Sequence, residues 1–224
     1  MDEKIERLLY TTKDGIWYWE TDYAADKLEL DDEDIDFDRI PEIRKLLTKP
    51  VASLPELYVP LEAALVLTSW GDEEGLRYLE YVVNLRPDRW GNGEPHRLRC
   101  YDTTYEWIAN SVIFFRLAHL ERTGKDVMRK RVFPILSMLL KYCETLQFEF
   151  PLHHFLHEEA LEYDSSLKSY LRAMLADKSD FHHHKPGDAV KFFLKYDPVF
   201  LETVLKEANK NLSDYSSYIN EREY

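Results

Sequence analysis

The feature that most constrains the fold is a pair of apolar segments joined by a short acidic turn, residues 53–88. Ser53 and Glu56 have the spacing of a capping box, which predicts a helix that begins with its first backbone amides satisfied. Apolar residues then recur at helical spacing until Gly71, where we expect the helix to end. Asp72 and the two glutamates after it favour the start of a second helix, because negative charge suits the positive end of the helix dipole.

The second segment of this pair is apolar around much of its circumference, through residues 76–85. Two antiparallel helices with so much apolar surface are not stable alone, so further helices must cover them. The chain has only 7 glycines, which argues against an all-β fold with many tight turns. The sequence therefore predicts an all-α fold of antiparallel helix pairs.

Beside the central pair, the rest of the chain offers about eight further periodic segments that can form helices. We expect them at residues 2–12, 39–47, 103–122, 125–146, 152–159, 167–175, 189–194 and 201–212. The segment 125–146 has Pro134 in its interior, where proline kinks a helix. We expect one α-helical domain over residues 1–224: an acidic and aromatic section (1–50), a helical body (51–212) and a flexible tail (213–224).

Composition limits the cellular setting. Hydrophobic residues make up 45% of the 224 residues, enough for a sizeable core, but the apolar runs are too short to span a bilayer. The charge pattern of the first residues does not fit a signal peptide. Two cysteines, Cys100 and Cys143, provide neither a disulfide framework nor a four-ligand metal motif, and Cys143 lies on an apolar helix as an inert core thiol. We expect a cytoplasmic protein.

Acidic residues are concentrated near the N-terminus. Residues 20–42 contain eleven acids and two bases, a net charge of −9, so only −4 of the total of −13 lies elsewhere. Such a field repels nucleic acid and anionic membranes and attracts a basic protein partner. The arginines of the connection 86–101 are an internal alternative, because they could pair with the same acids.

Tryptophans stand directly before this acidic stretch. In one reading they pack on the first helices as a cap; in the other they form a binding hot spot with the carboxylates, since tryptophan and tyrosine dominate interface energetics. We predict that the contact residues are Trp17, Trp19, Tyr23, Asp31, Asp32, Asp34, Asp36 and Asp38. A calcium loop of the EF-hand kind is excluded, because Phe37 replaces the turn glycine and Ile43 replaces the bidentate glutamate.

Histidines give the one candidate for metal chemistry. His153 and His157 are four residues apart on an expected helix, which places two imidazoles on one face, with Glu158 beside them. The loop 182–184 could add a third histidine, although His-rich loops are often simply exposed polar sequence. No P-loop, dinucleotide-binding glycine motif or serine-nucleophile motif is present in the sequence. We expect no cofactor, and a metal-dependent enzyme remains an alternative function.

An internal similarity suggests a family. Residues 59–65 align with residues 133–139, matching Pro60 with Pro134 at an offset of 74 residues. With the small residues Ala63 and Ala64 and a leucine-rich second helix, the chain resembles HEAT-like repeat proteins over residues 54–86 and, more loosely, 103–146.

This resemblance implies a HEAT-like or irregular α-α superhelical array that acts as a binding surface. Small acidic bacterial proteins of this type look like the immunity proteins of toxin–immunity pairs. The expected function is therefore a protein-binding module whose acidic face binds a basic partner, as an immunity or inhibitor protein does. A metal-dependent enzyme and a structural adaptor are the alternatives.

Overall fold

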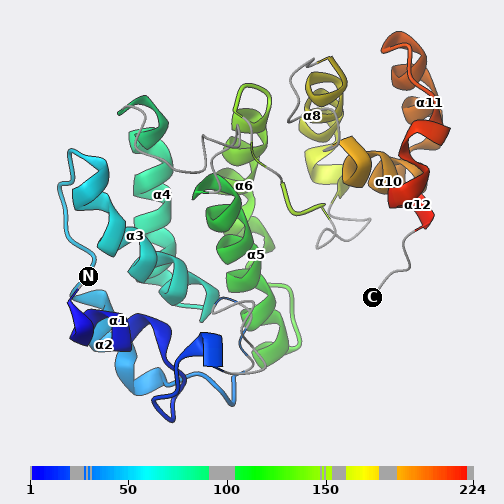
Figure 1. The fold of residues 1–224 in the computed structure, drawn as a ribbon. Coiled ribbons are helices and arrows are strands. Elements are labelled where there is room, and N and C mark those ends of the chain that lie inside the picture. Colours follow the sequence, from blue (N-terminus) through cyan, green and yellow to red (C-terminus); the bar gives the residue numbers. More distant parts are fainter. Residues whose placement is uncertain are drawn as a thin grey trace. The chain divides into compact units, whose positions relative to one another are not determined.

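The protein is all-helical over the residues that its computed structural model describes, namely 2–20, 28, 30, 32–90, 104–146, 148, 150–152, 160–176 and 186–220. Figure 1 shows the elements in order. The α-helices are α1 (Glu3–Tyr10), α2 (Ile40–Arg44), α3 (Leu54–Ser69), α4 (Glu73–Leu85), α5 (Thr104–Thr123), α6 (Arg129–Cys143), α8 (Asp164–Ala176), α10 (Pro186–Tyr196), α11 (Pro198–Glu207) and α12 (Ser216–Asn220). Short 3-10 helices are η1 (Tyr18–Glu20), η2 (Phe37–Arg39), η3 (Pro87–Arg89), η6 (Leu161–Tyr163) and η7 (Leu212–Tyr215).

By their contacts the residues group into two compact units. The first unit comprises Met1–Gly93 and Trp107–Leu136, and the second comprises Glu94–Glu106 and Ser137–Tyr224. The boundary therefore passes through α5 and α6. The candidate binding residues near the N-terminus all belong to the first unit.

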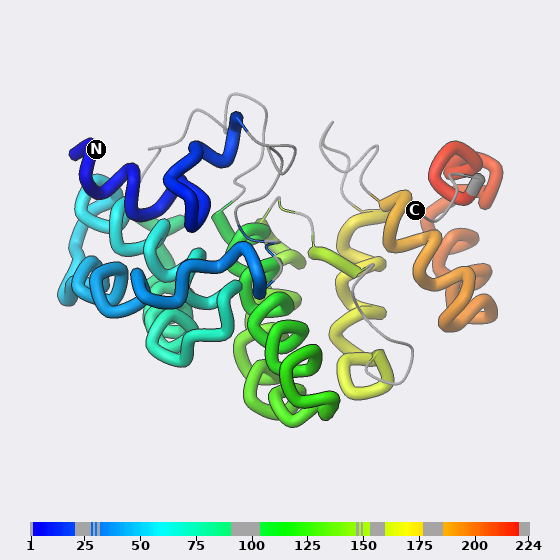
Figure 2. Tube along the Cα trace, turned by 90° about the horizontal axis from the view of Figure 1, so that it is seen from below, coloured from blue at the N-terminus to red at the C-terminus, as the bar shows by residue number. Residues whose placement is uncertain are grey.

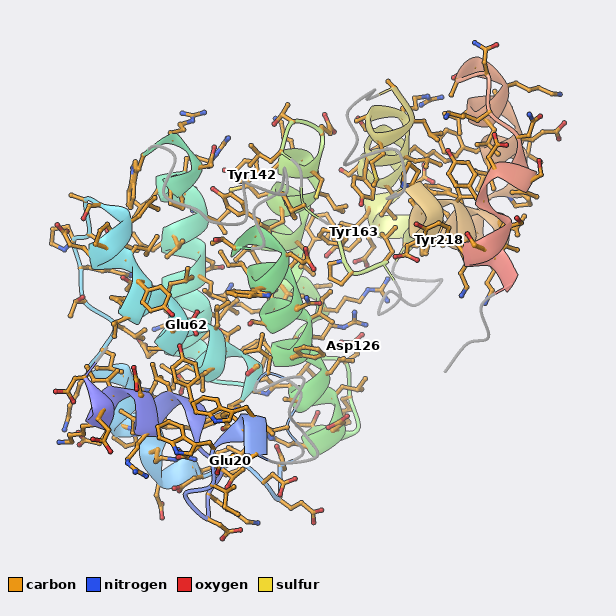
Figure 3. The ribbon with its side chains drawn as sticks, in the orientation of Figure 1. Glu20, Glu62, Asp126, Tyr142, Tyr163 and Tyr218 are labelled. Carbon is orange, nitrogen blue, oxygen red and sulfur yellow. The ribbon has the colours of Figure 1, made fainter. Side chains whose placement is uncertain are left out.

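Helix α3 is the centre of the first unit. Its residues from Pro60 to Ser69 are all buried, including the charged residue Glu62. The Glu62 carboxylate accepts a hydrogen bond of 2.8 Å from the hydroxyl of Tyr10 on α1, so the buried carboxylate is compensated. Figure 3 labels Glu62 on the side of α3 that meets α1. A helix buried on all sides needs neighbours on all sides, and the first unit provides them.

The predicted pair of α3 and α4 is confirmed, with its turn at the predicted residues. Gly71 ends the first helix with φ at +82°, a left-handed conformation that glycine adopts without a steric penalty. The side chain of Asp72 then caps α4 by accepting from the amides of Glu74 and Gly75, at 3.0 and 3.2 Å. The start of α3 differs in detail: the Ser53 side chain makes no capping hydrogen bond, and Glu56 accepts from the amide of Ala52 at 3.0 Å.

Helices α1 and α2 cover α3 from the N-terminal section of the chain (Figure 2). Leu9 of α1 and Ile43 of α2 are fully buried in one apolar cluster with Val66 and Trp70 of the α3 segment. Helix α2 is shorter than the predicted 39–47, because the chain turns away at Lys45. This turn places the carbonyl of Thr48 where it accepts a 2.8 Å hydrogen bond from Tyr78 on α4.

Arginines connect α4, α5 and α6 within the first unit. Arg131 of α6 bonds to Glu73 and Glu80 on α4, which raises the pKa of its guanidinium. Arg116 of α5 is only 3% exposed and forms a two-pronged ion pair with Asp126, in the loop before α6. Hydrogen bonding to Arg116 lowers the pKa of Asp126, which Figure 3 labels.

The second unit is built around α10. Phe193 of α10 is fully buried, and its ring centroid lies 5.1 Å from that of Phe200 on α11. A Cβ atom at Gly187 would lie 2.3 Å from the ring of Tyr218, so the glycine allows α12 to approach α10 closely (Figure 3). Residues 212–220, most of which we expected in a flexible tail, form η7 and α12, with Tyr215 buried.

The two prolines of the internal similarity occupy different places. Pro60 lies inside α3, the first helix of the α3–α4 pair, whereas Pro134 lies inside α6, which follows α5. The offset of 74 residues therefore aligns a helix that comes first in its pair, α3, with a helix that comes after its neighbour, α6, so the two helices do not correspond. The HEAT-like arrangement stays a prediction from the sequence.

We predict that Gly75→Ala destabilises the first unit, although alanine favours helix. The added Cβ would lie 2.7 Å from the Leu67 Cβ and from the Thr68 backbone nitrogen on α3. Overpacking against backbone costs about 3 kcal/mol, more than the ~1 kcal/mol that alanine gains in helix propensity. Urea unfolding should show a net loss of about 2 kcal/mol. Asn84→Ala, at an exposed site of the same helix, is the control and should change stability by less than about 0.5 kcal/mol; a stabilised Gly75→Ala protein would contradict the close packing.

We predict that Asp126→Asn lowers stability at pH 7 by about 2 kcal/mol, because buried Arg116 loses its charged partner. The folded pKa of Asp126 lies below its unfolded value, so the stabilisation is complete above about pH 4 and is lost as the pH falls further. The difference between wild type and variant, measured by chemical unfolding, should therefore narrow below about pH 4. Glu121→Gln, an exposed carboxylate on α5, is the control, and a pH-independent difference would argue against the ion pair.

Candidate functional site

The first candidate residues, Trp17 and Trp19, form a stacked pair. Their ring centroids lie 4.6 Å apart with planes inclined by 15°, and the guanidinium of Arg7 lies 5.2 Å from the Trp17 ring centre. A tight turn brings the chain back after α1: the Thr12 amide donates to the Ile16 carbonyl at 2.8 Å, and Gly15 has φ at +78°. The stack is therefore held beside α1 by local structure.

One edge of this pair faces solvent. Trp19 is 59% exposed, whereas Tyr18 between the two tryptophans is buried with 5% exposure. Burial raises the pKa of Tyr18, although nearby Arg39 opposes the rise. Buried Tyr18 anchors η1, and Trp19 projects from it. Packing on the first helices as a cap fits Trp17, which is half-buried. A role as a binding hot spot fits Trp19, which is exposed.

Asp32 lies against the protein's own Arg122, on α5. The guanidinium Nε donates to the two carboxylate oxygens at 3.0 and 2.7 Å, and a second guanidinium nitrogen makes a further hydrogen bond. These hydrogen bonds lower the pKa of Asp32. Arg122 also donates to the Trp70 carbonyl at 3.0 Å and lies 5.1 Å from the Phe37 ring centre. The ion pair of Asp32 thus anchors this part of the acidic stretch to α5.

Asp36 also has an internal role. Its carboxylate lies 3.1 Å from Nε of Arg39 and accepts a 3.2 Å hydrogen bond from the amide of Asp38. Arg39 in turn donates to the carbonyls of Leu8 and Thr11, at 3.3 and 2.8 Å, and so caps the end of α1. Asp36, like Asp32, is therefore a structural residue of the first unit.

The other predicted acids fall into two groups. Asp34 is half-buried, and one of its carboxylate oxygens is buried with no hydrogen-bond partner among the residues the structure describes. Asp38 is exposed, as are Glu20 beside Trp19 (Figure 3) and Glu33. Tyr23 and Asp31 lie outside the described residues. The exposed carboxylates nearest the tryptophan pair in sequence include Glu20, which the sequence analysis had not selected.

The metal candidates cannot be placed in the fold. His153, His157 and Glu158, the histidines 182–184 and Cys100 all lie outside the described residues. Within the described ranges, no three His, Cys, Asp or Glu side chains gather as a metal ion would need. Cys143 is buried as predicted, and burial raises the pKa of its thiol, which keeps it protonated and unreactive at neutral pH.

A basic hollow beside the tryptophan pair was missed by the sequence analysis. It has a volume of about 440 Å³ and lies between α1, the turn after it and α2. The charged residues that line it are Lys4, Arg7, Lys13, Asp36, Arg39 and Glu42, four bases against two acids in a chain of net charge −13. The spacing of Lys4 and Arg7, on one face of α1, is the part of this pattern that the sequence already contains.

The sequence matches no known protein family, and no curated protein or solved structure shows a significant match to it. Of the described helices, none combines the length and the apolar character required to cross a lipid bilayer. We therefore infer the function of this protein from the side chains of its candidate site.

We predict that Arg122→Ala increases local opening of the part of the acidic stretch that follows Asp32, residues 32–39. The change removes the Asp32 ion pair, a hydrogen bond to Trp70 and the contact with Phe37, together worth about 2 kcal/mol. Hydrogen exchange should become faster at the amides of residues 32–39. Lys125→Ala, an exposed basic residue in the loop after α5, is the control. Unchanged exchange in the Arg122 variant would show that Asp32 does not fasten the segment.

Proposed function

We propose that this protein is a protein-binding module and that Trp19 is the central anchor of its interface. The observation that carries the proposal is the exposed, stacked tryptophan pair, with Trp19 at 59% exposure. Burying a large aromatic ring that is exposed to water lowers the free energy, and tryptophans are enriched at the energetic centres of interfaces. Since Trp17 and the turn after α1 support the ring, little conformational entropy would be lost on binding.

The charges around this pair favour a basic partner. Asp32 and Asp36 are engaged internally, so the carboxylates that we assign to partner contact are the exposed Glu20, Glu33 and Asp38, with Asp31 and Tyr23 as predictions from the sequence. Asp34 is half-buried and contributes to the local field. The net charge of −13 would steer a cationic protein toward the surface and make association sensitive to salt.

The particular role that fits this surface is that of an immunity or inhibitor protein, which covers the basic active face of a toxin in the cytoplasm. Its support is the resemblance of a small, acidic, helical chain to such proteins, together with the exposed aromatic anchor. In a structural adaptor the same tryptophan would bind a partner without strong dependence on salt. Salt dependence therefore separates the two.

The test begins with affinity capture of partners by the full chain from cells that produce it, followed by identification and purification of the captured protein. Binding is then measured across a range of salt concentrations. A basic partner whose affinity falls steeply with salt supports the proposal. For the immunity role, expression of the partner alone should arrest growth, and co-expression of this protein should restore it; a partner that is harmless when expressed alone would overturn that role.

We predict that Trp19→Ala weakens partner binding about 30-fold, equivalent to about 2 kcal/mol for a hot-spot residue, while the variant stays folded at the temperature of the measurement. Isothermal titration calorimetry with the purified partner measures the effect. Trp107→Ala, at the other exposed tryptophan of the described first unit, is the matched control and should bind like wild type. Equal affinities for Trp19→Ala and wild type would remove the tryptophan pair from the interface.

A further inference from the structure

The basic hollow is a second feature whose chemistry differs from that of the acidic surface. Helix α1 contributes Lys4 and Arg7 from one face, and the turn after α1 contributes Lys13. Arg39 lies at the inner side, where it is only 14% exposed. The hollow is open to solvent, and Arg7, whose guanidinium lies 5.2 Å from the Trp17 ring centre, is the residue that it shares with the tryptophan pair.

Helix geometry alone would make this hollow unfavourable for an anion. The last carbonyls of α1 carry the negative end of its dipole and lie at the edge of the hollow. Arg39 donates hydrogen bonds to the carbonyls of Leu8 and Thr11 and to the Thr11 hydroxyl, so these oxygens are already covered by positive charge. The repulsion that the end of α1 would exert on an anion is therefore reduced.

The charges that remain are mainly positive. Asp36 is paired with Arg39, so these two residues neutralise each other. Glu42 forms an ion pair with Lys45, outside the hollow, and its pKa is lowered by hydrogen bonding to Lys45 and, to a smaller extent, by the charge of Lys4. The neighbours of the other cations leave them able to reach a ligand: Arg7 meets exposed Glu3 at 3.2 Å, and the Lys13 ammonium bonds to the Glu33 carbonyl.

We propose that this hollow binds a small anion that carries a diphosphate group. Lys4, Arg7 and Lys13 approach from two sides and would balance about three negative charges, the charge of a diphosphate rather than of a single carboxylate. The guanidinium of Arg7 suits two phosphate oxygens at once. The Thr12 hydroxyl accepts from the Ile16 amide at 3.3 Å and keeps its own proton to donate to a ligand. A volume of about 440 Å³ holds a diphosphate with room for a larger substituent.

Titration calorimetry on the full chain tests the site, with inorganic pyrophosphate and adenosine diphosphate as separate probes and no divalent metal. We expect saturable binding of pyrophosphate that the double variant Lys4→Gln, Lys13→Gln weakens at least tenfold, while circular dichroism stays unchanged. Equal affinity for the two probes identifies the diphosphate group alone as the ligand; tighter binding of adenosine diphosphate identifies a nucleotide.

The matched control is the double variant Lys125→Gln, Lys130→Gln, which removes the same charge from exposed sites of the first unit away from the hollow. It should bind pyrophosphate within about twofold of wild type, because distant surface charges are screened. The proposal is overturned if pyrophosphate does not saturate wild type by about 10 mM. It is also overturned if the hollow variant binds like wild type, or if the control weakens binding as much.

Discussion

The enclosure of α3 is the constraint on which the first unit depends. A helix whose residues from Pro60 to Ser69 are all buried has no polar face to turn toward water. It must therefore be covered by other helices, among them α1, α2 and α4, and each of these neighbours brings polar helix ends close to an apolar core. Arginine side chains resolve this conflict: Arg39 covers the end of α1, Arg44 pairs with the α4 cap Asp72, and Arg122 bonds to the carbonyl that ends α3.

This arrangement explains which parts of the fold could be predicted from the sequence. The α3–α4 pair was predictable because its determinants are local: a glycine at the turn, a capping aspartate and apolar residues at helical spacing. The end of α2 at Arg44 was not, because the turn that follows it is joined to Tyr78, thirty residues away from Thr48 in the sequence. Gly75 likewise reads as an ordinary helix residue until α3 is seen to lie against it.

The candidate site shows the same division between local and distant determinants. The aromatic pair was predictable because Trp17 and Trp19 are two residues apart in the sequence and stand directly before the acidic stretch. The structural role of Asp32 was hidden, since its partner Arg122 is ninety residues away in the sequence. The internal partners that the sequence suggested for the acids were instead the arginines of residues 86–101. The basic hollow was hidden by the net charge, because a total of −13 conceals Lys4 and Arg7 on one face of α1 and the Lys13 that the turn after α1 brings back to them.

The buried carboxylate of Glu62 has a consequence for how α1 is oriented. The apolar surface of α3 would accept a covering helix in many positions, since hydrophobic contact has no preferred direction. A carboxylate within that surface accepts only placements that bring a donor to it, and the Tyr10 hydroxyl is that donor. Sliding or rotating α1 would break this hydrogen bond to the carboxylate, at a cost of about 2 kcal/mol. One polar atom thus selects a single register for the N-terminal helix, and with it the position of every side chain that α1 presents to solvent.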